Sequence, residues 1–109
     1  MSRQVIVHDA ARFDAIDIAY FIAEDSLESS DCFSEALDGA FEQLAEFPGV
    51  GVSRDYDNPK LRGIRMWPIP DFPNYLIFFQ ADNSELRVLR ILHGARDIHS
   101  LFAPDDGEN

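Results

Sequence analysis

The stretch RVLRILHGARDI, residues 87–98, places charged side chains inside a run of Val, Leu and Ile that is otherwise typical of a buried strand. Two of its residues can do chemistry. The guanidinium of Arg90 binds phosphate or carboxylate groups, and the imidazole of His93 titrates near neutral pH. Arg90 and His93 are therefore candidate phosphate-binding and acid–base groups. Two residues do not complete a catalytic set, so the catalytic residues stay unassigned.

Alternation along the strand predicts where these arginines point. Within residues 85–94, Arg90 shares a face with Leu and Val side chains, and Arg87 lies on the other face. A guanidinium is not stable when dry and unpaired, so its face must be open to water, carry a carboxylate or contact a ligand. We expect arginines from two strands to line an uncovered sheet face as a basic groove. The expected members are Arg62, Arg65 and either Arg87 or Arg90.

The alternative is that these arginines form ion pairs and spread their stems over apolar surface. The acidic residues considered for such pairs are Asp55, Asp57, Glu85 and Asp97. Arg96 is expected to pair locally with Asp97. Trp67 also has two interpretations, as a side chain that fills the core or as an exposed anchor for a partner.

The charge distribution restricts the partners. The net charge of −11 argues against direct binding of nucleic acid, which depends on Lys and Arg at phosphates. Residues 1–53 carry two basic and eleven acidic side chains, whereas residues 54–96 carry seven basic and five acidic ones. An anionic partner is therefore expected to bind the C-terminal half, if it binds at all.

Hydrophobic periodicity predicts a helical hairpin. In the first helix Asp9 is the N-cap candidate, and apolar residues recur at helical spacing at Phe13, Ile16, Ala19 or Tyr20, and Ala23. The Ser-rich residues 26–32 are expected to form a turn that separates the two helices. A second helix of about 15 residues then runs from Phe33 to Phe47 and stops at Pro48-Gly49. Gly39 inside it suggests the close approach of a neighbouring element.

Strand patterns complete an α+β domain, in which the hairpin packs on one face of a mainly antiparallel sheet. Strands are expected at residues 4–7, 61–69, 74–80 and 85–94, with the last three forming an antiparallel meander. The run YLIFF lacks polar alternation and predicts a central strand buried on both faces. Residues 1–102 are expected to form one domain, followed by a flexible acidic tail at 103–109.

The sequence does not predict a disulfide, a metal site, a cofactor site or a membrane span. Cys32 is the single cysteine, so no internal disulfide is expected. The three histidines show no metal-site spacing, and no cofactor-binding motif is present, so neither a metal nor a cofactor is expected. The apolar runs fall far short of the ~20 residues of a membrane span, and a cytoplasmic location is predicted.

The segments LRGIRMWPIPDFPNYLIFF and LRVLRILHGARDI resemble the ParE branch of the RelE/ParE toxin superfamily. AYFIAEDS in the first helix and LAEFPGVG at the end of the second are similar to landmarks of the same family. The resemblance runs from about Val5 to Leu101. It implies the toxin of a bacterial type II toxin–antitoxin module, of the kind involved in plasmid stabilisation, that is neutralised by a bound antitoxin.

The resemblance implies two different activities. ParE-like toxins inhibit DNA gyrase, whereas RelE-like relatives cut mRNA on the ribosome. Here Tyr75 is followed by Leu76 where ribosome-dependent members generally carry arginine, and no tyrosine follows Tyr75. The interpretation therefore favours a gyrase inhibitor without enzymatic activity, with the mRNA endonuclease as the alternative. A degenerate, weakly toxic homologue that binds antitoxin is a further alternative, because the chain is more acidic than such toxins are expected to be.

The resemblance also assigns partners. A cognate antitoxin and DNA gyrase are the expected protein partners, and a homodimer or a heterotetramer with antitoxin is the expected assembly. The residues expected to bind target or antitoxin are Arg62, Arg65, Trp67, Arg87, Arg90 and Arg96.

Overall fold

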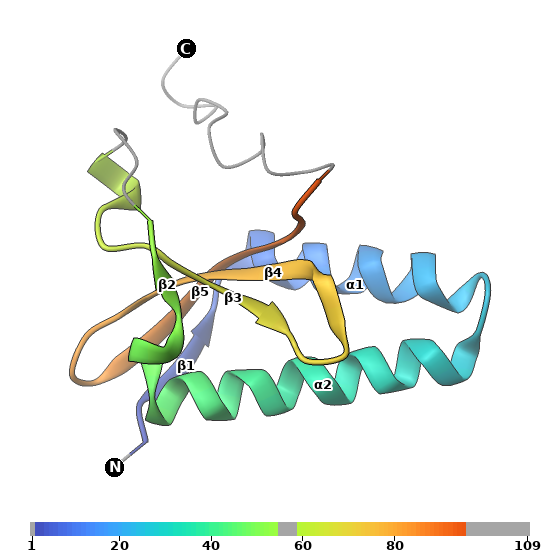
Figure 1. Cartoon of the computed structure of the whole chain (residues 1–109), viewed down its shortest axis with the longest axis horizontal. Coiled ribbons are helices and arrows are strands. Elements are labelled where there is room, and N and C mark those ends of the chain that lie inside the picture. The colour runs from blue at the N-terminus through green and yellow to red at the C-terminus, as the bar shows by residue number, and fades with distance from the viewer. Residues whose placement is uncertain (1, 55–58, 96–109) are drawn as a thin grey trace.

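The computed structural model describes residues 2–54 and 59–95 (Figure 1). Its strands are β1 (Gln4–Val7), β2 (Val52–Ser53), β3 (Arg65–Ile69), β4 (Phe72–Ala81) and β5 (Glu85–His93). Its α-helices are α1 (Asp9–Ala23) and α2 (Leu27–Glu46), and two short 3₁₀ helices are η1 (Pro48–Val50) and η2 (Pro59–Leu61). The predicted α+β class is confirmed. The expected tail at 103–109 lies outside the described residues.

The five strands form one mixed sheet in the order β1-β5-β4-β3-β2. β1 runs parallel to β5, and the other neighbours are antiparallel, so the predicted meander of β3, β4 and β5 is confirmed. β4 is the middle strand, as its apolar run predicted. Ile77 and Phe79 point to one side of β4 and Phe78 to the other, and all three are fully buried.

The second helix of the hairpin, α2, begins earlier than predicted and is longer. α2 begins at Leu27, so the expected Ser-rich break is wrong except at Ser26, whose hydroxyl caps the helix by accepting the Ser29 N–H at 3.1 Å. Ser30 lies within α2 and donates its hydroxyl to the Ala19 carbonyl of α1 at 2.8 Å. Serine here joins the two helices instead of ending one. A Cβ added at Gly39 would meet no neighbouring atom within 4 Å, so the expected close approach is wrong.

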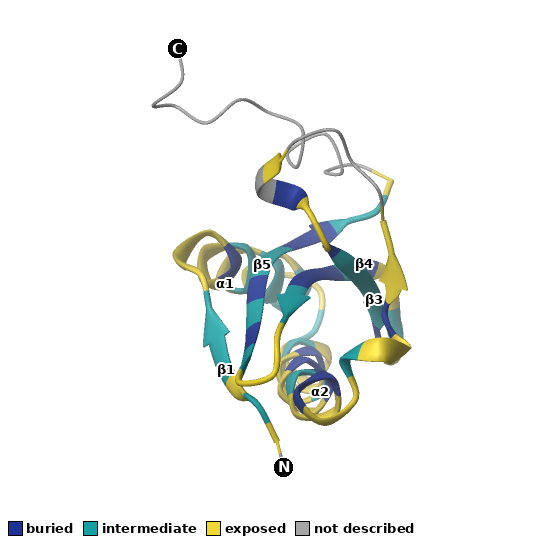
Figure 2. Cartoon of the chain, turned by 90° about the vertical axis from the view of Figure 1, so that its left-hand side faces the viewer, coloured by how far each residue is buried: buried dark blue, intermediate teal, exposed yellow. Residues whose placement is uncertain are grey.

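Two apolar cores lie on opposite faces of the sheet. The larger core lies between the sheet and the helices, and the burial pattern of Figure 2 shows the inner faces of α2, β4 and β5 buried. The smaller core is built from Leu61, Ile64, Phe78 and Leu92. Leu61 and Ile64 come from the segment that precedes β3, so the sheet face turned away from the helices is apolar at its centre and partly covered.

A bulge in β5 changes which side chains face the helices. Phe78 lies opposite Arg90 and Phe79 lies opposite Val88, so Leu89 is an extra residue in β5. Val88 and Ile91 consequently both belong to the larger core, although they are three residues apart. The predicted strict alternation is therefore wrong beyond Val88.

Candidate functional site

Arg90 is held by a carboxylate of the first helix. Its Nε and one terminal nitrogen donate to the two oxygens of Asp14 at 2.7 and 2.9 Å, which is a bidentate pair. The pair is partly shielded, with 28% of the Arg90 side chain and 14% of the Asp14 side chain exposed. Arg90 lies on the side of the sheet turned away from the helices, opposite Phe78, but the prediction that it contributes to a basic groove there is wrong, because Asp14 neutralises it. An ion pair does explain the charge in the strand, but its acid is Asp14, which was not among the expected partners.

Asp14 also completes the hydrogen bonding of β5. β1 pairs with β5 only as far as Val88, and beyond that point Asp14 accepts the Ile91 N–H at 3.0 Å. A side chain of α1 thus replaces the missing stretch of strand. This double use of one carboxylate fixes α1 against the edge of the sheet.

Arg87 lies in a second acidic cluster, at the β4–β5 turn. Its guanidinium donates to Asp82 at 2.9 Å and to Glu85 at 3.2 Å. Asp82 also accepts the backbone N–H groups of Ser84 and Glu85, each at 2.8 Å. The hydrogen bond from Arg87, followed by these two backbone donors, holds the pKa of Asp82 well below its usual range. The hydrogen bond to Asp82 likewise raises the pKa of Arg87.

Arg65 and Trp67 lie on the helix side of the sheet. Arg65 donates to the Gly51 carbonyl at 2.8 Å and so ties β3 to the segment after η1. Trp67 is partly buried against the larger core, which supports the core-filling interpretation. Its indole Nε1 is buried, and within the described part of the chain it has no hydrogen-bond acceptor. Arg65 lies on the helix side of the sheet, Arg87 pairs with acids at the β4–β5 turn, and Arg90 pairs with Asp14. The prediction that these arginines form one basic groove is therefore wrong.

The two candidate catalytic residues do not come together. His93 lies opposite Tyr75, with the two ring centres 5.3 Å apart at an angle of 88°, and its Nδ1 accepts the Ala95 N–H at 3.2 Å. Tyr75 faces the larger core, whereas the residue opposite Arg90, Phe78, faces the smaller one. His93 and Arg90 therefore leave β5 on different sides.

Arg62 is the predicted binding residue that stays on the surface. Its side chain is exposed, and its backbone carbonyl accepts a hydrogen bond from the Gln80 side chain at 2.8 Å. Arg96 lies outside the described residues. In residues 2–54 and 59–95 no cluster of potential metal ligands is found, and no helix there is long and apolar enough to cross a membrane.

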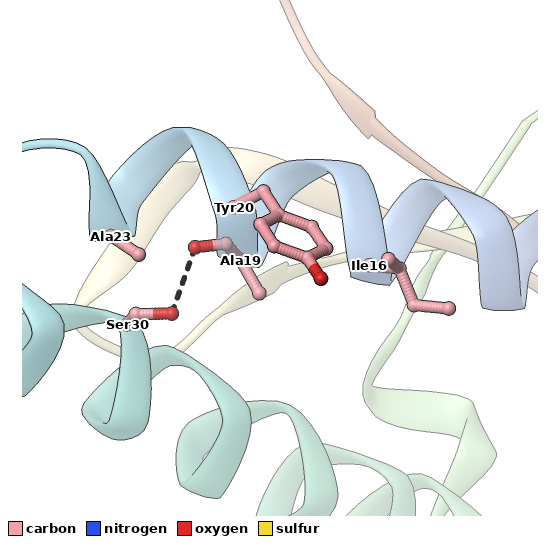
Figure 3. A pocket seen from close by; sticks show the side chains of 5 residues that line it. All are labelled: Ile16, Ala19, Tyr20, Ala23 and Ser30. Carbon is pink, nitrogen blue, oxygen red and sulfur yellow. Dashed lines mark hydrogen bonds between the residues drawn. The ribbon is translucent and has the colours of Figure 1, made fainter.

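The sequence reasoning missed an exposed apolar stripe on α1. Phe13, Ile16 and Tyr20 are 64%, 46% and 73% exposed, although their helical spacing is the usual signal of a core-facing side. The residues of α1 that pack inward are Ala11, Ala15, Ile18, Ala19 and Ile22. Figure 3 shows the groove beside the stripe, lined by Ile16, Ala19, Tyr20, Ala23 and Ser30.

Comparisons with known proteins identify the family. The family model for the ParE toxin of the type II toxin–antitoxin system parDE matches residues 5–98. A solved structure of the chromosomal ParDE toxin–antitoxin system from P. aeruginosa is similar to the chain, with a TM-score of 0.65 and 16% sequence identity over 84% of this chain and 96% of that one. No curated protein sequence matches significantly. With the family model covering nearly all of the described fold, the chain belongs to the ParE toxin family of type II toxin–antitoxin systems.

Proposed function

We propose that the chain is the toxin of a parDE-type module, that it inhibits DNA gyrase by binding to it, and that a cognate antitoxin neutralises it. The observation that carries this proposal is the match of the ParE toxin family model over residues 5–98. The similar fold of the P. aeruginosa ParDE structure supports it.

The arrangement of the arginines supports binding over RNA cleavage. Cleavage of mRNA needs positioned acid and base groups and cations at the phosphates. Arg90 is occupied by Asp14, and His93 leaves the strand on another side. Arg87 lies between two carboxylates. These pairs neutralise Arg87 and Arg90, and the net charge of −11 opposes the approach of an RNA backbone.

A supercoiling assay tests the proposal directly. Purified gyrase is incubated with relaxed plasmid, ATP and increasing amounts of this protein. Supercoiled product is expected to fall, and premixing with the antitoxin encoded beside the gene is expected to restore it. A plasmid-relaxation assay with a type I topoisomerase is the control for nonspecific effects on DNA. Full supercoiling at a large excess of protein would contradict gyrase inhibition.

A translating extract tests the alternative of ribosome-dependent cleavage. The proposal expects intact message after addition of the protein. If the unmodified protein cleaves the message and the Arg90→Ala or His93→Ala variant leaves it intact, the nuclease activity would be established instead. Light scattering on the toxin–antitoxin complex would separate a heterodimer from the expected heterotetramer.

A further inference from the structure

An exposed arginine of the edge strand lies on the sheet face turned away from the helices. The backbone N–H of Arg54 donates to the Ile64 carbonyl at 3.0 Å and so continues the pairing of β2 with β3. Ser53 lies opposite Arg65, which is on the helix side of the sheet. Because side chains alternate along a strand, Arg54 points to the other side, where its partner Ile64 belongs to the smaller core.

Arg62 reaches the same face from the turn before β3. Its backbone carbonyl accepts a hydrogen bond from the Gln80 side chain at 2.8 Å. Gln80 follows Phe79, which packs in the larger core, so Gln80 points away from the helices. The side chains of Arg54 and Arg62 are both exposed, and neither pairs with an acid in residues 2–54 and 59–95. Both guanidinium groups are therefore available to a partner.

Apolar surface borders these two cations. Val52 shares the face of Arg54 by alternation and is 50% exposed. Its partner in register, Met66, is partly buried against the smaller core. β2 is the last strand in the order of the sheet, so this surface lies at the sheet edge (Figure 1). We call Val52, Arg54 and Arg62 the β2 patch.

The β2 patch is an exception in an acidic chain. Residues 47–69 contain four basic and two acidic side chains, whereas the rest of the chain contains five basic and eighteen acidic ones. At physiological salt, charges act over about 8 Å, so a short acidic segment is attracted by the patch alone. A long polyphosphate would also meet the acidic remainder. Charge complementarity therefore favours a short acidic segment of a protein, whose aliphatic side chains can also cover Val52.

We infer that the β2 patch binds an acidic segment of the gyrase target, with carboxylates on Arg54 and Arg62 and an aliphatic side chain on Val52. This inference rests on the proposed function, because it requires that the chain binds gyrase. It places the target contact on the sheet face turned away from the helices. The arginines of β3 and β5 are not needed for it, since their guanidinium groups are already bonded within the fold.

Charge reversal tests the cationic contact. Arg54→Glu and Arg62→Glu are compared with Arg12→Glu, which reverses an exposed arginine on α1. Association of each full-length protein with immobilised gyrase, without DNA, is measured by interferometry. Each patch variant is expected to associate about tenfold more slowly at low salt, with a difference that shrinks as salt is added, and Arg12→Glu less than twofold more slowly. Equal rates for the patch variants and the unmodified protein would overturn the inference.

Truncation of Val52 tests the apolar contact. Val52→Ala is compared with Leu27→Ala, which shortens a side chain that is 74% exposed at the start of α2. Val52→Ala is expected to raise the Kd for gyrase about fivefold, and Leu27→Ala less than twofold. Circular dichroism and thermal unfolding verify that each variant is folded. An unchanged Kd for Val52→Ala would overturn the apolar contact.

The outcomes separate this inference from the proposed function. If the unmodified protein neither binds nor inhibits gyrase, both fail. If it inhibits gyrase and the patch variants inhibit equally, the patch is wrong and the proposed function stands. If the patch variants bind DNA-free gyrase normally and lose binding only to the gyrase–DNA complex, the arginines bind phosphate and the acidic segment is wrong. If the patch variants lose antitoxin binding or self-association instead, with gyrase binding unchanged, the occupant is wrong.

Discussion

The carboxylate of Asp14 accepts the Nε–H of Arg90 at 2.7 Å and, through the same oxygen, the N–H of the next residue at 3.0 Å. This relationship explains how an arginine is tolerated in the middle of an apolar strand. β5 loses its parallel neighbour after Val88, and a helix side chain supplies both the missing acceptor and the counter-charge. The pair also joins the helical hairpin to the sheet.

Asp14→Ala is expected to lower the free energy of unfolding by about 2 kcal/mol. It leaves a strand N–H without its acceptor and a partly shielded guanidinium without its counter-charge. Asp17→Ala on the same helix is the control, because Asp17 is exposed and its loss should cost less than about 0.5 kcal/mol. Urea unfolding of both variants gives the comparison, and equal midpoints would show that the Asp14 pair adds nothing to stability.

The Asp82 cluster predicts a loss of stability in acid. Because the folded chain holds the pKa of Asp82 below its usual value, the unfolded chain takes up the proton first. The stabilisation is therefore complete above about pH 4 and is lost as pH falls from there toward the lower folded pKa. Asp82→Asn and Arg87→Gln are each expected to make the decline of melting temperature between about pH 4 and about pH 2 shallower. A decline as steep as that of the unmodified protein in both variants would contradict the assignment.

Gly51→Ala is expected to destabilise the protein by roughly 1–3 kcal/mol, because the methyl group overpacks the core. The new Cβ would lie 2.5 Å from Phe79 Cζ and 3.2 Å from the Arg65 Cβ, and Phe79 is fully buried. Gly49→Ala is the matched control two residues away, where nothing lies within 4 Å. Thermal unfolding should separate the two variants by several degrees, and a Gly51→Ala protein as stable as the control would show that Phe79 can move aside.

Gly39→Ala is expected to stabilise the protein by about 0.5–1 kcal/mol. Gly39 is an exposed residue in the interior of α2, and alanine restricts the unfolded chain without meeting any neighbour. The measurement is the midpoint of denaturant unfolding. A lower midpoint would mean that Gly39 has a packing role after all.

The fold could be predicted from the sequence because its signals are local or strongly periodic. The segment QVIV forms β1 as expected, and the absence of polar alternation in YLIFF placed β4 at the centre of the sheet. The end of α2 before Pro48 was also predictable, since proline and glycine follow it. The start of α2 was not predictable. The Ser30 hydroxyl donates to a carbonyl of the neighbouring helix, so it does not compete for the backbone hydrogen bonds of α2.

The site could not be predicted to the same extent, because it depends on contacts distant in sequence. One extra residue at Leu89 moves the side chains beyond it to the other face, and no residue type marks this bulge. Asp14 and Arg90 are 76 residues apart, so local charge pairing could not find them. Phe13 and Tyr20 have the spacing expected of a core-facing side, and only the packing of Ala15 and Ala19 against the larger core shows that another side of α1 faces inward.

The topology of a reporter plasmid in cells tests the central claim most directly. The chain is induced alone or together with the antitoxin encoded beside its gene, and plasmid topoisomers are resolved on chloroquine gels. If the chain is a gyrase-directed ParE toxin, plasmid from cells with the chain alone should lose negative supercoiling as growth stops, and the antitoxin should restore both. Growth arrest with unchanged topoisomers would contradict the account.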